Sequence, residues 1–158
     1  MAESLKEISF NGGVIKFKIP SSWKEEYGKN GKGAFYEDAP DTGTLRLQVI
    51  TMQAPPDVEG DLLVLALSSL PGVDRQDVEI LGNGNALAHS VQRSDEDGEE
   101  YTLYWWHLAN HVPPDIVRMA NYSYAILTSK ENDSKTREEI ELLERQIKQA
   151  VFQPGPGE

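Results

Sequence analysis

Alternation of hydrophobic and polar side chains predicts β-strands along most of the chain. Ile15, Phe17 and Ile19 alternate with lysines, which is the period of a strand with one buried face. Residues 11–13 read Asn-Gly-Gly and favour a tight hairpin before this strand, because Asn and Gly tolerate positive φ. The strands that such patterns predict span residues 5–10, 15–20, 33–38, 44–52, 77–81, 86–94, 100–112 and 116–128.

Helical spacing appears at three places between and after these strands. Residues 58–70 are apolar on more than one face and follow a Pro-Pro-Asp start signal, so we expect a largely covered helix there. A serine followed three residues later by glutamate predicts a short helical turn at 21–25. After the capping residues 132–134, one apolar stripe repeats opposite a charged side and predicts an amphipathic closing helix.

The two longest strands decide the predicted architecture. The strand at 100–112 is apolar at both parities, with Leu103 and Trp105 on one side and Tyr104 and Trp106 on the other. Both faces of the sheet are therefore expected to be covered, one by each helix. The pattern predicts an α+β fold in which an antiparallel sheet of about six to eight strands lies between helices, a three-layer α/β/α sandwich.

Length and composition indicate one ordinary domain. The 158 residues, of which 39% are hydrophobic, are enough to bury a core, so we expect a single domain at 1–152. Residues 153–158, Gln-Pro-Gly-Pro-Gly-Glu, have nothing to bury and are expected to form a disordered tail. The absence of cysteine excludes thiolate catalysis, disulfides and cysteine-ligated metals.

The beginning of the chain and its apolar runs bear on its location. Three charged side chains within residues 1–10 interrupt the apolar stretch that an export signal needs. The longest apolar run, 62–67, is far shorter than the roughly 20 residues of a membrane-spanning helix. We therefore expect a cytoplasmic protein that does not bind membranes.

The charge is strongly negative and unevenly distributed. A formal net charge of -11 argues against nucleic acid as a partner. Residues 33–100 hold three basic and fourteen acidic side chains. The densest run, Asp-Glu-Asp-Gly-Glu-Glu at 95–100, fits a solvated hairpin tip that discourages edge pairing. It also offers Asp95, Asp97 and Glu99 as binding residues for a basic protein partner.

Residues 28–33, Gly-Lys-Asn-Gly-Lys-Gly, resemble a phosphate-binding loop in composition only. A phosphate-binding loop of the Walker type needs Gly-Lys followed by Ser or Thr ahead of a helix, whereas here an aromatic strand follows. We interpret the segment as a turn.

The histidines are the only nitrogen ligands for a metal centre. On a strand, His107 and His111 are about 13 Å apart, too far to share one ion. If Ser94 pairs with Glu99, His89 lies opposite Tyr104 and points to the other sheet face from His107. We therefore expect no metal, no cofactor and no set of catalytic residues, while a single histidine in proton transfer stays an alternative.

Aromatic side chains on the last two strands are candidates for a ligand groove. Tyr101, Trp105, His107 and Tyr122 share one sheet face if Val112 and Asp115 flank the turn, with Arg118 near one end of the groove. Trp and Tyr combine a large apolar area with a polar tip, which binding surfaces favour. Packing in the core is the alternative for at least half of them.

The order of elements resembles a known family. The segments FKIPSSW, TLRLQVIT and REEIELLERQIKQAVF make residues 5–152 similar to the Mog1/PsbP-like α/β/α sandwich family. That resemblance implies a binding function, because its members include a regulator of a small nuclear-transport GTPase, an extrinsic photosystem subunit and bacterial envelope or secretion-adaptor proteins. It assigns no functional residue to this sequence.

Two functions follow as hypotheses. The first is a non-enzymatic protein-binding module (an adaptor, chaperone or immunity-type protein) with an acidic surface and an aromatic groove. Its partner is expected to be a protein that is basic or carries an apolar segment; the oligomeric state is left open. The second is a small-molecule-binding or hydrolytic enzyme that uses a histidine with nearby carboxylates. It requires a pocket in which these groups are within hydrogen-bonding reach.

Overall fold

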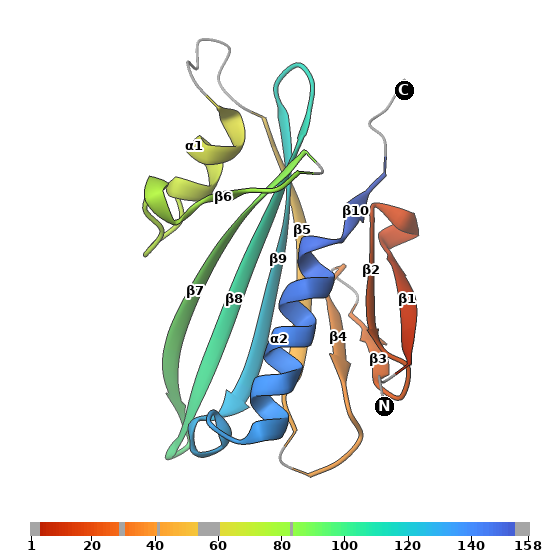
Figure 1. Ribbon diagram of the computed structural model, residues 1–158, viewed down its shortest axis with the longest axis vertical. Helices are drawn as coiled ribbons and strands as arrows, with labels where there is room; N and C mark the ends of the chain where they lie inside the picture. The colour runs from red at the N-terminus through yellow and green to blue at the C-terminus, as the bar shows by residue number, and fades with distance from the viewer. Residues whose placement is uncertain (1–3, 29–30, 41, 54–60, 83, 154–158) are drawn as a thin grey trace.

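A large antiparallel sheet forms the body of the molecule. The structure is a computed structural model and describes residues 4–28, 31–40, 42–53, 61–82 and 84–153. Seven strands follow one another across the large sheet (Figure 1). In spatial order they are β3 (Lys24–Tyr27), β4 (Gly33–Tyr36), β5 (Thr44–Gln53), β9 (Ile116–Leu127), β8 (Glu99–Val112), β7 (Asn85–Glu96) and β6 (Glu79–Ile80).

A second, smaller sheet joins the two ends of the chain. Strands β1 (Leu5–Phe10) and β2 (Ile15–Pro20) form the predicted hairpin, and β10 (Val151–Phe152) pairs with β2 on its other side. Gln153 extends this pairing, because its backbone N–H donates to the Val14 carbonyl at 3.0 Å. Gln153 is thus held by the small sheet, in contrast to the tail predicted for 153–158, and residues 154–158 lie outside the described part.

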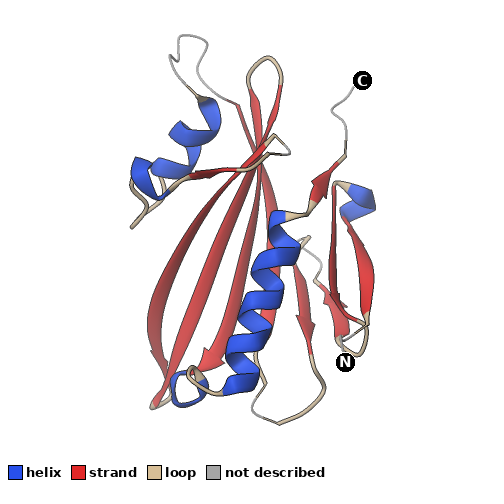
Figure 2. Cartoon of the chain, in the orientation of Figure 1, coloured by secondary structure: helices blue, strands red, loops and turns tan. Residues whose placement is uncertain are grey.

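Two helices complete the fold (Figure 2). The helix α2 (Ser134–Lys148) is the predicted amphipathic closing helix. The helix α1 (Leu62–Ser68) is shorter than predicted and begins where the Asp61 carboxylate accepts the Leu63 N–H at 2.9 Å. Residues 58–60 of the predicted helix lie outside the described residues. Single 3-10 turns occur at Asn11–Gly13, Arg75–Asp77 and Thr128–Lys130.

The helical turn predicted at 21–25 is wrong. The chain is extended from Lys24, and β3 pairs with β4 so that Glu25 lies opposite Phe35. Trp23 anchors this segment in the core, at 3% exposed. Tertiary pairing therefore outweighs the local capping signal of Ser22.

One face of the large sheet carries the main core. Side chains of β8 and β9 at even positions, such as Trp106 and Tyr122, pack against Leu143 and Ile147 of α2 and against Phe17 of the small sheet. The rings of Phe17 and Tyr122 meet edge to face, with centroids 5.2 Å apart. In Figure 1, α2 lies across this face and the β1–β2 hairpin beside it.

Among the described residues, the opposite face is covered at one end only. There Leu63 and Leu67 of α1 pack on Ala86, Ala109 and Met119, whose side chains are mostly small. Figure 1 shows α1 near one end of the long strands, while the rest of their length extends past it. The predicted α+β sandwich is confirmed, with the second helical layer confined to this end.

The close approach of Gly43 to Tyr124 gives a prediction. A Cβ built on Gly43 would lie 2.2 Å from the ring of Tyr124, which is itself fully buried. We expect Gly43→Ala to lower the free energy of unfolding by about 1–3 kcal/mol through overpacking. Urea denaturation measures this, and Gly82→Ala is the matched control, because a Cβ there meets nothing within 4 Å. Equal stability of the two variants would contradict the packing described.

The buried phenol of Tyr122 gives a second prediction. Its hydroxyl has no hydrogen-bond partner among the described residues, and burial raises its pKa well above the usual 10.0. The unfolded phenol ionises near pH 10 while the folded one stays protonated, so the free energy of unfolding falls above that pH. We expect Tyr122→Phe to reduce this fall by about 1.4 kcal/mol in total between pH 9 and 11, measured by urea denaturation. A slope identical to that of the wild type would refute it.

Candidate functional site

The candidate site is the part of the large sheet that faces away from α2 and lies beyond α1. We call it the open face and define it by its side chains: Arg46 and Gln48 of β5, Asn121 and Ser123 of β9, and Tyr101, Leu103, Trp105 and His107 of β8. Strand pairing arranges them in rows. Arg46 lies opposite Ser123, which lies opposite Trp105, and the next row runs from Gln48 through Asn121 to His107.

Trp105 and His107 form one stacked unit in this face. Their rings are nearly parallel, with an interplanar angle of 7° and centroids 5.5 Å apart. The indole N–H donates to Gln92 at 3.3 Å, and His107 Nδ1 donates to the Asn121 side-chain oxygen at 2.7 Å. Both rings are therefore held in place while remaining only partly buried.

Burial and hydrogen bonding oppose each other at His107. Desolvation lowers the pKa of its imidazole below 6.5, and the Asn121 oxygen offsets part of that shift because it favours the protonated ring. His89 lowers the pKa further by repulsion. The result is an imidazole that is neutral at pH 7.

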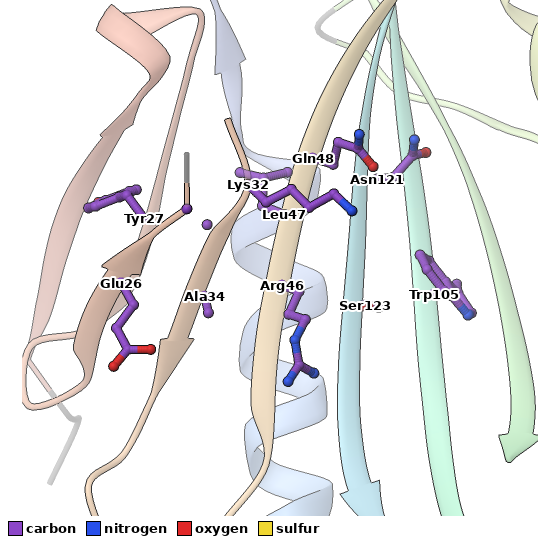
Figure 3. A pocket seen from close by; sticks show the side chains of 12 residues that line it. Glu26, Tyr27, Lys32, Ala34, Arg46, Leu47, Gln48, Trp105, Asn121 and Ser123 are labelled. Carbon is purple, nitrogen blue, oxygen red and sulfur yellow. The ribbon is translucent and has the colours of Figure 1, made fainter. Parts of the chain in front are cut away.

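A hollow of about 410 Å³ lies beside Trp105. Gln48, Asn121 and Ser123 contribute polar groups to its lining, and Trp105 contributes an aromatic wall. In Figure 3 the Lys32 side chain extends across β5 toward β9, and Arg46 runs along β5 beside Ser123. Glu26 lies at the margin, where its carboxylate accepts the Tyr36 hydroxyl at 2.7 Å.

A second hollow of about 500 Å³ continues the open face toward the β7–β8 hairpin. Arg46 lines both hollows. Tyr101 and Leu103 line the second one, together with Glu96 and Glu99 from the hairpin end. The Tyr101 hydroxyl donates to Glu99 at 3.2 Å, which raises the pKa of the phenol. One continuous surface therefore passes from a cationic half to an acidic half.

Three of the predicted groove residues lie on this surface, and two do not. Tyr101, Trp105 and His107 belong to the open face. Tyr122 and Arg118 are wrong as groove residues, since they lie on the α2 side at 0% and 8% exposed. Arg118 instead bonds Asn110 at 2.8 Å and the Gln153 carbonyl, and lies over the Phe152 ring.

The cause is a register difference of one residue. Val112 pairs with Ile116, and not with Asp115, so Trp105 lies opposite Ser123. Because side chains alternate between faces, this shift moves every even-numbered residue of β9 to the other side of the sheet.

The acidic residues of the β7–β8 hairpin lie on different faces of the sheet. The turn consists of Asp97 and Gly98, which both have positive φ, and Glu96 pairs with Glu99. Glu99 lies on the open face, whereas Asp95 points to the opposite side by strand alternation. All three predicted acidic residues, Asp95, Asp97 and Glu99, are exposed.

The three histidines are separated, as predicted. His89 pairs with Trp106 and not with Tyr104, but this two-residue difference keeps it on the face opposite His107. Its ring stacks on Trp106 at 5.5 Å, and His111 bonds the Pro114 carbonyl at 3.2 Å. Within the described ranges, no group of three or more histidine and carboxylate side chains is placed to hold a metal ion.

Several residues of the open face were missed by the sequence analysis. Arg46 and Gln48 lie within the predicted strand 44–52, and Lys32 lies within the predicted turn 28–33; neither pattern marks them as binding residues. Asn121 and Ser123 of β9 alternate with the buried Tyr122 and Tyr124. This alternation of polar and aromatic residues is the signal that could have identified them.

Comparison with solved structures identifies the architecture. No protein-family model and no curated protein matches the chain. A structure from Bacteroides thetaiotaomicron superposes with a TM-score of 0.63 at 19% identity over 97% of this chain and 50% of that one, so the chain spans about half its length. LpqN, described as involved in cell envelope biogenesis of Mycobacterium tuberculosis, gives a TM-score of 0.61 at 14% identity over 96% and 91% of the two chains. The Saccharomyces cerevisiae Ran-binding protein Mog1p gives 0.52 at 10% identity over 96% of each. The chain has a Mog1/PsbP-like fold.

The Mog1/PsbP-like fold was predicted from element order, and at these identities the likeness concerns the fold alone. Among the described residues, no helix has the length and apolar character needed to cross a bilayer.

The environment of His107 gives a third prediction. We expect NMR titration to place its pKa below 6.5, and Asn121→Ala to lower it further by removing the oxygen that favours the charged ring. Because the unfolded imidazole binds the proton more readily, this residue also lowers the free energy of unfolding as the pH falls below about 6.5. A pKa above 6.5, or an upward shift in the variant, would show that the ring is not held as described.

Proposed function

We propose that the chain is a protein-binding module that receives its partner on the open face. The observation that carries this proposal is the uncovered half of the large sheet, where the Trp105–His107 stack lies beside two adjoining hollows. Rings that are held by hydrogen bonds lose little conformational freedom on binding, and Trp is enriched at the centres of protein interfaces.

The acidic hairpin tip supports a charged partner. Asp97 and Glu99 stand exposed at one end of the open face, and a basic partner segment would be attracted to them. The proposal retains the expected cytoplasmic location. It also retains a protein rather than a nucleic acid as the partner, which the net charge of -11 favours. The Ran-binding description of the yeast neighbour is in keeping with a protein partner.

The enzymatic alternative draws less support from the geometry. General acid–base catalysis needs a histidine and a carboxylate within reach of each other. The hydrogen bonds that the histidine rings make go to the Asn121 side chain and to the carbonyls of Trp105 and Pro114. The neutral amide of Asn121 orients the ring, but it stabilises a protonated imidazole less than a charged carboxylate does.

Site-specific photo-cross-linking in the host tests the proposal. A photoreactive phenylalanine analogue replaces the exposed Gln48 of the open face or, as the matched control, the exposed Glu141 of α2. We expect a discrete cross-linked protein from position 48 and none from position 141. Introducing Trp105→Ala should reduce the yield at position 48 by at least about fivefold, because it removes the aromatic wall.

Charge reversal of Asp97 and Glu99 to lysine, in the same cells, should also reduce the yield. Equal cross-linking from positions 48 and 141, or a yield that Trp105→Ala does not change, would refute the open face as the binding surface. Circular dichroism of each variant checks that the fold is retained, which we expect because all of these positions are exposed or only partly buried.

A further inference from the structure

The open face carries charges of opposite sign at its two ends. Lys32 and Arg46 line the hollow beside Trp105, and within the described part of the chain neither has an ion-pair partner. Other lysines are engaged, since Lys24 contacts Asp38 at 3.4 Å and Lys135 of α2 contacts Glu37 at 2.8 Å. Glu26 also lines this hollow, where its carboxylate accepts the Tyr36 hydroxyl, so two cations face one anion. The remaining positive charge, on a strongly acidic protein, points to an anionic group on the occupant.

The other end of the open face is negative. Glu96 and Glu99 line the second hollow, and Asp97 stands exposed in the turn beyond it. Arg46 lies between the two hollows, so the change of sign occurs along one surface. A small anion would satisfy only the cationic half, whereas a single chain that carries both charges satisfies both halves.

The distance between the two charged ends of the open face, measured along β8, determines the length of the segment that can span them. Glu99 precedes Trp105 by six residues on β8, which is about 20 Å along a strand. An extended segment of about seven residues spans that distance. The lining also offers the side chains of Gln48 and Asn121, which can pair with the backbone of an extended segment; a helix would already have satisfied its own backbone groups.

We propose that the open face binds an extended segment of a partner protein whose two ends carry opposite charges. A carboxylate lies between Lys32 and Arg46, an apolar side chain rests on Trp105 and Leu103, and a basic side chain about six residues away meets Glu96 and Glu99. This inference rests on the proposed function and adds to it the chemistry and polarity of the occupant.

Synthetic seven-residue peptides test the polarity. Two peptides carry Glu at one end and Lys at the other, in the two possible orders, with Tyr, Leu and Ser between them; two control peptides carry Lys at both ends or Glu at both ends. Of the three tryptophans, Trp23 and Trp106 are buried at 3% and 0%, so Trp105 fluorescence reports occupation of the open face. Calorimetry measures the affinity independently.

We expect one of the two dipolar peptides to bind about fivefold more tightly than either control, as one partly exposed charge pair contributes. In the double variant Lys32→Glu and Arg46→Glu, the preference should change to the peptide with Lys at both ends. The matched control is Lys16→Glu together with Lys18→Glu, two exposed lysines of β2, which should leave the order of affinities unchanged.

The outcomes separate this inference from the proposed function. Equal affinity for all four peptides, no binding at millimolar concentrations, or a preference that the double variant leaves intact would overturn the dipolar segment. Cross-linking from position 48 would then still support the open face as a protein-binding surface. Tighter binding of free glutamate than of any peptide would show a small-anion site and would also overturn the inference.

Discussion

The pairing of β8 with β9 is the constraint on which the rest of the structure depends. Val112 opposite Ile116 places the large rings of both strands on the α2 side and the amides, hydroxyls and the Trp105–His107 stack on the open face. A shift of one residue would bury Asn121 and Ser123 under α2 and expose Tyr122. The free energy of such an exchange is large, since a buried aromatic side chain contributes about 2–3 kcal/mol through the hydrophobic effect alone. The core and the candidate site are therefore two consequences of one register.

This dependence explains which parts could be predicted from the sequence. The eight predicted strands, the amphipathic closing helix and the antiparallel order follow from local periodicity and are confirmed, whereas β3 and β10 were not predicted. The site residues could be identified only with the correct register of the β8–β9 hairpin. Its turn, Pro113–Asp115, has three residues instead of the predicted two, so Tyr122 and Arg118 lie on the face opposite to the predicted one. The second hairpin differed by two residues and kept His89 on its predicted side. A register error of one residue places a side chain on the wrong face of the sheet, whereas an error of two residues leaves it on the correct face.

Other parts of the site depend on distant contacts that no local pattern contains. Lys32 reaches the open face because β3 and β4 pair beside β5, although its own segment has only turn signals. The extended conformation at Lys24 arises from the same pairing and overrides a capping pattern. The extent of α1 coverage likewise follows from the alanines at 86, 88 and 109, whose small size lets the helix approach the sheet at one end.

The joining of β10 to β2 has a consequence for biosynthesis. Residues 15–16 meet their partners at 151–152, far along the sequence, so this part of the small sheet stays incomplete until both segments have been synthesised. Until residues 151–152 have left the ribosome, β2 lacks its partner on the side away from β1. The small sheet is thereby completed only after every strand of the large sheet has been synthesised, and a chain cut before residue 151 lacks the strand that pairs with β2.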